Sequence, residues 1–348
     1  MRCSKDTEDV CIMRKETILA ASILMLLIAA MTATAYADTS YSVYIMDPTN
    51  SANGGKGISS SGYWVGQIPI RITAGTQTFQ TQSYCMNYDK LIYICSTYTA
   101  TLTPATDNAA WRAASYILSW YDPADNNAAA VDQVAIWRLL NPSYVRESWL
   151  DVNIDNAGAA LASTASGRDV VRQGDLFNWI SPITTDGASV QGSPGQTLAF
   201  TAQLKNSAGT PRPNVKVQFT VILNTGTTSV QLNSIYVTPA EAFTDSQGMV
   251  QVIVQVPADT PMGSTIQIQA STKSVWPQRY VDLTNPDNQD LIAMGSTFNL
   301  TMTTNIAILG YITVVPESAL GALSALVAFA AAFVIWTRVK KQKGPMNP

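Results

Sequence analysis

The sequence contains no histidine in its 348 residues. This absence excludes histidine-based catalytic triads, histidine-ligated metal sites and imidazole general bases. Charged residues make up only 13% of the chain and the formal net charge is −3, which excludes a basic surface for nucleic acid. A G-x-S-x-G nucleophile elbow and a metal-ligand cluster are also missing. We therefore expect neither an enzyme nor a cofactor or metal, although scattered acidic pairs leave a glycosidase open.

The N-terminal region, residues 1–37, has the features of a secretory signal peptide. Basic residues precede an apolar run from Ile18 to Ala30, and a small-residue cleavage pattern ends at Ala37. The stretch before Met13 is acidic for a leader, so translation starts at either Met1 or Met13. In both cases the mature chain begins after residue 37.

A second apolar segment, residues 318–337, contains 20 residues without a charge. As a helix it would be about 30 Å long, which matches the hydrocarbon core of a bilayer. Four basic residues follow, so residues 338–348 are expected to form a cytoplasmic tail and the preceding chain to lie outside. We expect a single-pass protein at the cell surface. The pair Pro316-Glu317 leaves enzymatic processing of the anchor open.

The region 38–182 is expected to combine strands with helices in one α+β domain. It opens with segments rich in Tyr, Thr, Ser and Gly, and residues 68–73 and 76–84 alternate with a period of two. This alternation places Cys85 at the end of a strand. Residues 91–102 are expected to form another strand.

Helical periodicity follows in the same region. Residues 109–121 repeat apolar positions at spacings of three and four, after Asn108 as a cap, and a second helix is expected from about Ala128 to Asn141. Gln133 and Trp137 fall on one face of that second helix. A third, Ala-rich helix is expected at residues 156–166.

Residues 183–275 are expected to form an all-β sandwich. Four segments of alternating apolar residues, separated by turn signals, are typical of short sandwich strands; they are Leu198–Leu204, Val215–Val221, Val250–Val256 and Ile266–Ala270. The segments starting at Gly209 and Thr244 resemble invasin-type bacterial Ig-like repeats, which implies a rigid spacer. Residues 276–317 are less regular and are expected to form a membrane-proximal stalk, with a possible glycosylation sequon at Asn299.

Two motifs in the first region point to chemistry. Tyr84-Cys85-Met86 and Asp132-Gln133-Val-Ala-Ile-Trp137 resemble the two signatures of the thioester domains found at the tips of bacterial surface adhesins. The resemblance covers residues 38–182. The sequence departs from the family in Asp132, in Met86 and in the presence of a second cysteine, Cys95.

The resemblance implies a thioester between Cys85 Sγ and Gln133 Cδ. It implies a cell-surface adhesin that reacts with a lysine amine on a partner protein or with an amine-bearing glycan, and forms an amide. Tyr84, Asp132, Ile136 and Trp137 are expected to support the thioester pocket. Because there is no histidine, Asp132 or the positioning of the amine is expected to assist proton transfer.

The competing interpretation is a Cys85–Cys95 disulfide in a structural envelope protein with an inert head. Cys3 and Cys11 are lost with the leader, so two cysteines remain, and an even cysteine count in an extracellular chain favours a disulfide. The Gln-x-Ala-Ile-Trp pattern of the second motif favours the thioester instead. Cys95 is then left as a thiol, free or buried.

Overall fold

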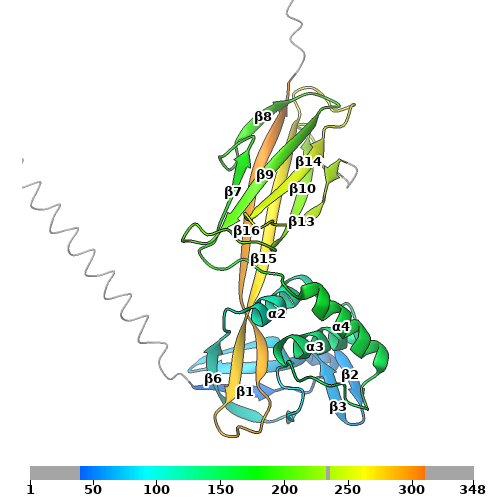
Figure 1. The fold of residues 1–348 in the computed structure, drawn as a ribbon, viewed down its shortest axis with the longest axis vertical. Coiled ribbons are helices and arrows are strands. Elements are labelled where there is room, and N and C mark those ends of the chain that lie inside the picture. Colours follow the sequence, from blue (N-terminus) through cyan, green and yellow to red (C-terminus); the bar gives the residue numbers. More distant parts are fainter. Residues whose placement is uncertain (1–39, 233–235, 310–348) are drawn as a thin grey trace, which may run out of the picture.

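The computed structural model describes residues 40–232 and 236–309. The expected signal peptide (1–37), membrane span (318–337) and tail (338–348) lie outside these residues. Within the described ranges, no helix is both long and apolar enough to cross a membrane. The described chain is rich in β-structure, with three α-helices. A long two-stranded hairpin connects a lower part that carries the helices to an upper part of strands (Figure 1).

The lower part, which we call the head, is built on strands that close into a ring. The neighbours are all antiparallel and follow one another in the order β15, β6, β1, β4, β5, β16 and back to β15. Alternate residues of β1 and β4 point inward and are fully buried, including Val43, Ile45, Ile70 and Ile72. The ring strands are β1 (Ser40–Ile45), β4 (Ile68–Ala74), β5 (Gln77–Cys85), β6 (Thr97–Pro104), β15 (Thr265–Asp282) and β16 (Leu291–Ile308).

The predicted alternation at 68–73 and 76–84 is confirmed by β4 and β5, and Cys85 is the last residue of β5. The strand expected at residues 91–102 begins only at Thr97. Between β1 and β4 lies a separate hairpin of β2 (Gly57–Ser60) and β3 (Tyr63–Gly66). A short 3-10 helix, Ser51–Asn53, precedes it.

Three helices pack on the head: α2 (Ala109–Trp120), α3 (Asn126–Leu140) and α4 (Val152–Ala165). Each begins at a polar cap whose side chain accepts a backbone N–H, as the first turn of a helix requires. Asn108 caps α2 as expected, and Asp125 caps α3, which begins two residues before the expected start at Ala128. Helix α4 begins four residues earlier than predicted. It packs closely on α3 because Gly158 leaves no side chain between them: a Cβ there would lie 2.5 Å from Val134.

The upper part consists of two sheets packed face to face. Phe200, Val252, Val217 and Ile268 from the two sheets share one buried core. The predicted alternation is confirmed in β9, β10 and β14. One sheet contains β12 (Val237–Thr238), β14 (Met249–Gln255), β9 (Thr197–Lys205) and β7 (Leu176–Ser181); the other contains β11 (Ser229–Gln231), β10 (Lys216–Asn224), β13 (Glu241–Phe243), the distal ends of β15 and β16, and β8 (Ser189–Gly192).

The hairpin of β15 and β16 differs from the expected organisation of the chain. We expected the sandwich to end at residue 275 and a stalk to follow, but β15 continues without interruption to Asp282. Its distal half pairs with β10, and residues Gln278–Asp282 pair with β6 in the head. The sequence did not predict one continuous strand here, because Pro277 normally argues against a strand interior. The structure accommodates the proline at a bulge between Trp276 and Gln278. The sequon residue Asn299 lies exposed on β16, opposite Lys273.

Candidate functional site

The structure brings Cys85 and Gln133 together, although they are 48 residues apart. The Cys85 backbone N–H donates to Gln133 Oε1 at 2.7 Å, and Gln133 Nε2 donates to the Cys85 backbone oxygen at 2.7 Å. Cys85 ends β5 and Gln133 lies in the middle of α3, where it faces the ring. Their exposed fractions are only 3% and 1%. Two hydrogen bonds therefore hold the Gln133 carboxamide against Cys85, the residue whose thiol could attack it.

The thiol of Cys85 has its own neighbours. Burial raises its pKa to about 12, and a hydrogen bond with the side chain of Gln289 opposes this rise. Gln289 is buried and also donates to the backbone oxygen of Asn87. It precedes β16, whose first residue, Leu291, pairs with Cys85. Sequence reasoning missed Gln289, because it lies in the region expected to be a stalk and belongs to no motif.

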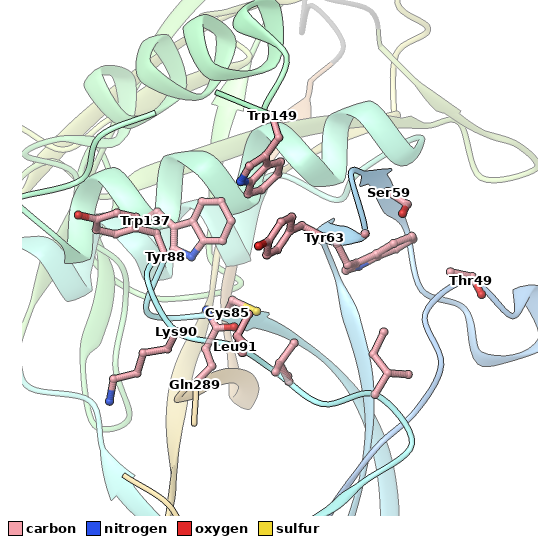
Figure 2. A pocket seen from close by; sticks show the side chains of 14 residues that line it. Thr49, Ser59, Tyr63, Cys85, Tyr88, Lys90, Leu91, Trp137, Trp149 and Gln289 are labelled. Atoms are coloured by element: carbon pink, nitrogen blue, oxygen red, sulfur yellow. The ribbon is translucent and has the colours of Figure 1, made fainter. Parts of the chain in front are cut away.

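A cleft opens beside Cys85, and five of its 14 lining residues are aromatic (Figure 2). Tyr63 and Trp149 form one wall, with their rings stacked at 4.8 Å, and Trp137 and Tyr88 lie on the other side of the thiol. Among the described residues that line the cleft itself there is no carboxylate. Asp89 and Glu147 line an adjoining hollow that shares Tyr63, Tyr88 and Trp149 with the cleft, so the carboxylates nearest to the cleft lie at its border.

Of the expected pocket residues, Trp137 lines the cleft and Ile136 does not. Ile136 is fully buried with Tyr84 in a separate apolar cluster beneath α3. The Trp137 ring stacks on Tyr144 at 6.1 Å. The Tyr144 hydroxyl in turn donates to Asp155 at 3.0 Å, and the Arg138 guanidinium binds the same carboxylate. The indole therefore packs on a tyrosine that is itself fixed by a hydrogen bond and an ion pair.

Asp132 and Tyr84 contact each other away from the cleft. The Tyr84 hydroxyl lies 3.4 Å from Asp132 Oδ2, and neither side chain lines the cleft beside Cys85. Burial raises the pKa of Asp132 to about 7, while the Tyr84 hydrogen bond lowers it. Tyr84 points to the opposite face of β5 from Cys85, because successive strand residues alternate. The expectation that Asp132 assists an incoming amine therefore lacks the geometry it requires.

The two cysteines are not bonded to each other. Cys85 is buried and Cys95 is exposed, and both are free thiols in the structure. Cys95 has a φ of 61° in the turn before β6, and its N–H donates to the backbone oxygen of Ile45. The disulfide of the competing interpretation is not present. Cys95 is a free, exposed thiol in this arrangement.

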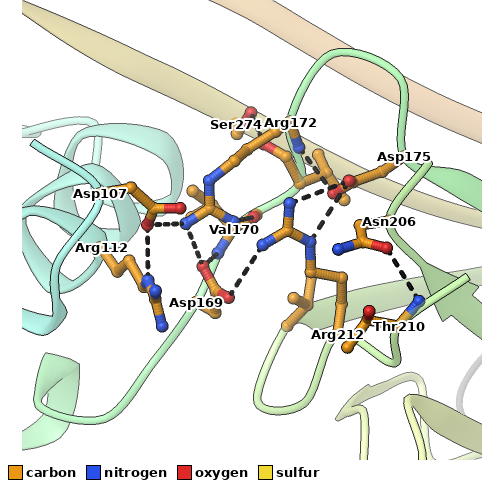
Figure 3. Close-up of polar contacts among 12 residues, drawn as sticks. Asp107, Arg112, Asp169, Val170, Arg172, Asp175, Asn206, Thr210, Arg212 and Ser274 are labelled. Atoms are coloured by element: carbon orange, nitrogen blue, oxygen red, sulfur yellow. Dashed lines mark hydrogen bonds and ion pairs between the residues drawn. The ribbon is translucent and has the colours of Figure 1, made fainter. Parts of the chain in front are cut away.

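A second polar cluster lies where the head meets the upper part (Figure 3). Arg212, from the loop before β10, reaches Asp175 Oδ1 at 3.1 Å and Asp169 Oδ2 at 3.9 Å. Arg172 bridges Asp169 to Asp107 beside α2. These groups pair with one another and join chain segments of both parts, so we assign this junction network to positioning the two parts.

No family model and no curated protein matches this sequence. A search of solved structures finds the Bacillus anthracis TIE protein at 11% identity and a TM-score of 0.28, covering 72% of this chain and 48% of that one. It also finds the thioester domain of the Enterococcus faecium TIE86 protein, at 12% identity and a TM-score of 0.28, covering 78% and 97% of the two chains. The ASH / PapD-like domain of human CEP192 matches at 12% identity and a TM-score of 0.21, covering 42% and 97%. Scores this low establish neither the fold nor the function of this chain.

Proposed function

We propose that Cys85 and Gln133 condense into an internal thioester, and that the chain is a cell-surface adhesin that uses this bond to attach covalently to amines. The observation that carries the proposal is the pair of 2.7 Å hydrogen bonds between the Gln133 carboxamide and the Cys85 backbone. These bonds hold the amide carbon at the residue that bears the nucleophile. Such positioning converts an otherwise improbable encounter into an intramolecular reaction.

The condensation is balanced without an external reagent. Cys85 Sγ attacks Gln133 Cδ, the C–N bond breaks, and Nε2 departs as ammonia after it takes up the thiol proton. The product is an activated acyl group in a site from which water is largely excluded, since both side chains are buried. This burial supports a long-lived thioester.

Attack by a lysine amine would then form an amide on the Gln133 side chain and release the Cys85 thiol. The bond is used once per molecule, so the chain is not an enzyme and needs no cofactor. Only about one lysine amine in 2,500 is uncharged at pH 7, given a pKa of about 10.4. The rate of attack should therefore rise with pH as the concentration of uncharged amine rises.

The partner would be an amine-bearing surface protein or glycan. The signal-like residues 1–37, the apolar residues 318–337 and the basic tail support an extracellular head tethered to a membrane. The strand-rich upper part, with its likeness in sequence to invasin-type Ig-like repeats, would serve as the spacer. Asn299 is exposed and is available for glycosylation in a host that has the enzymes.

Intact-mass spectrometry of the purified extracellular part tests the proposal. We expect a mass lower than the sequence by one ammonia, and incorporation of methylamine at Gln133. The control variant is Cys85→Ala, which retains the backbone N–H and oxygen that bind Gln133 and should therefore fold with the full mass. The proposal would be contradicted if the wild-type protein had the mass calculated from its sequence, or had lost two hydrogens that reduction restores. Either result would favour the structural envelope protein.

A further inference from the structure

The indole nitrogen of Trp137 is a buried donor without an acceptor among the described residues. The side chain is only 5% exposed, and buried tryptophan N–H groups normally find a partner. The residue nevertheless lines the cleft together with Cys85. Figure 2 shows the nitrogen on the edge of the ring that faces Cys85. An unsatisfied donor in this place calls for an acceptor that the protein with an unreacted Gln133 does not provide.

The position of Trp137 on its helix identifies that acceptor. Trp137 follows Gln133 by four residues in α3, so the two side chains lie one turn apart on the same face. Gln133 Oε1 already accepts one hydrogen bond, from the Cys85 N–H at 2.7 Å. A carbonyl oxygen has two lone pairs, so Oε1 can accept a second donor once condensation with Cys85 has changed its position, and that bond is strongest when Cδ becomes tetrahedral and the oxygen carries a full negative charge. The Trp137 N–H, one turn along the same helix face and beside Cys85, is the donor that can provide it.

We propose that the Trp137 indole N–H is the second donor of an oxyanion hole for Gln133 Oε1, a catalytic role that rests on the proposed thioester function. The Cys85 backbone N–H is the first donor. Sites that stabilise acyl-transfer intermediates commonly combine such donors, which act strongly in an environment from which water is excluded. The same hole serves both formation and opening of the thioester, because both pass through an oxyanion on Oε1.

In formation, the oxyanion arises when the sulfur of Cys85 attacks Cδ, and it collapses as ammonia leaves. In opening, an amine nitrogen attacks Cδ, the oxyanion forms again, and the C–S bond breaks as the Cys85 sulfur leaves and takes up the proton lost by the amine. Trp137 transfers no proton in either step and contributes only its hydrogen bond.

The surroundings of Trp137 fit this role, because a useful donor must not reorient during the reaction. Its ring stacks on Tyr144 with an interplanar angle of 23°. Tyr144 is itself fixed by its hydrogen bond to Asp155 and by the Arg138 guanidinium, which lies 4.9 Å from the centre of its ring. The indole is thus preorganised from the side opposite the cleft.

The sharpest test replaces Trp137 with benzothienylalanine, in which sulfur takes the place of the indole N–H while the shape is retained. Trp137→Phe is the genetically simpler second variant. The matched control carries benzothienylalanine at Trp111, a buried tryptophan of α2 that does not line the cleft. Mass spectrometry follows ammonia loss after cell-free synthesis and the rate of methylamine uptake at fixed pH. Infrared spectroscopy of chain labelled at the glutamine side-chain carbonyl reports the hydrogen bonds of the thioester oxygen.

We expect both rates to fall about 100-fold in the Trp137 isostere, the usual effect of removing one oxyanion donor. The thioester carbonyl stretch should move to higher frequency, which a purely structural effect would not produce, and the Trp111 isostere should match the wild type. If a Trp137 variant has lost one ammonia in mass and reacts with methylamine at the wild-type rate, this inference is overturned but the thioester function stands. A wild-type chain of full mass overturns both.

Discussion

Asn141 Nδ2 lies 2.7 Å from the backbone oxygen of Met86, the residue that follows Cys85. The same nitrogen lies 3.1 Å from the backbone oxygen of Trp137, so a single amide joins the end of α3 to the chain that leaves β5. Gln133 is hydrogen-bonded to Cys85 about two helical turns before Asn141. The two connections together fix both the distance and the rotation of α3 against the strand end.

Removing this connection should weaken the site without destroying the fold. We expect Asn141→Ala to lower the free energy of unfolding by about 1 kcal/mol, the typical net value of a hydrogen bond, and to slow ammonia loss because Gln133 is held less firmly. Urea unfolding and time-resolved mass spectrometry measure the two effects. The exposed Asn127, at the other end of α3, supplies the control variant Asn127→Ala. Equal behaviour of the two variants would contradict the role assigned to Asn141.

The stability of the chain should depend on pH through Asp132. Its folded-state pKa is raised to about 7 by burial, whereas an unfolded aspartate titrates near pH 4. Between these values the folded state binds more protons than the unfolded state, so stability is greatest at low pH and falls as the pH rises from about 4 to about 7. The steepest slope from one such group is about 1.4 kcal/mol per pH unit.

Asp132→Asn should remove this slope, since the amide does not titrate. Denaturant unfolding at several pH values in this window compares the variant with the wild type. Asp122→Asn is the matched control: Asp122 raises the pKa of Asp132 only as a minor cause, so most of the slope should remain. A slope that persists unchanged in Asp132→Asn would show that another group is responsible.

The two cysteines should differ sharply toward a thiol reagent. Cys95 is exposed, whereas Cys85 is buried with a pKa raised to about 12, which leaves roughly one thiolate in ten thousand at pH 8. We expect maleimide to label folded protein at Cys95 alone, even after methylamine has released the Cys85 thiol. Peptide mapping locates the label, and Cys95→Ser should take up none until it is unfolded. Equal labelling of both positions would contradict the burial of Cys85.

The ion pairs of the junction network should contribute unequally to the free energy of unfolding. Arg212 is the cation nearest Asp175, whose side chain is only 2% exposed, so Arg212→Ala leaves a buried carboxylate without its partner. Such a loss costs about 3 kcal/mol or more in the free energy of unfolding. Arg112→Ala breaks an exposed pair with Asp107 and should cost less than about 1 kcal/mol. Urea unfolding of both variants makes the comparison, and similar costs would contradict the different burial of the two pairs.

Local patterns allowed part of the site to be predicted. The period of two in residues 76–84 placed Cys85 at a strand end, and the helical spacing placed Gln133 and Trp137 on one face. Both patterns arise from side chains within one element, where neighbours along the sequence are neighbours in space. The Asn108 cap of α2 was predictable for the same reason.

Contacts between distant segments could not be predicted in this way. Gln289 reaches Cys85 only because β16 enters the ring beside β5, more than 200 residues further along the chain. No periodicity encodes such a pairing. The position of Asp132 illustrates the same limit: its place next to Gln133 in the sequence does not reveal that its side chain contacts Tyr84, on the face of β5 opposite Cys85.

The long hairpin has a mechanical consequence. Strand β16 begins beside Cys85 and ends at the far end of the upper part, while it pairs with β15 over most of its length (Figure 1). If the head were fixed to a surface at Gln133 and the chain were pulled from beyond Ile308, tension would run along β16 rather than across it. The hydrogen bonds between β15 and β16 would then share the force in shear, instead of opening one after another as in a zipper. Such an arrangement resists extension as a rod does, and the head and upper part would bear the pull as one body.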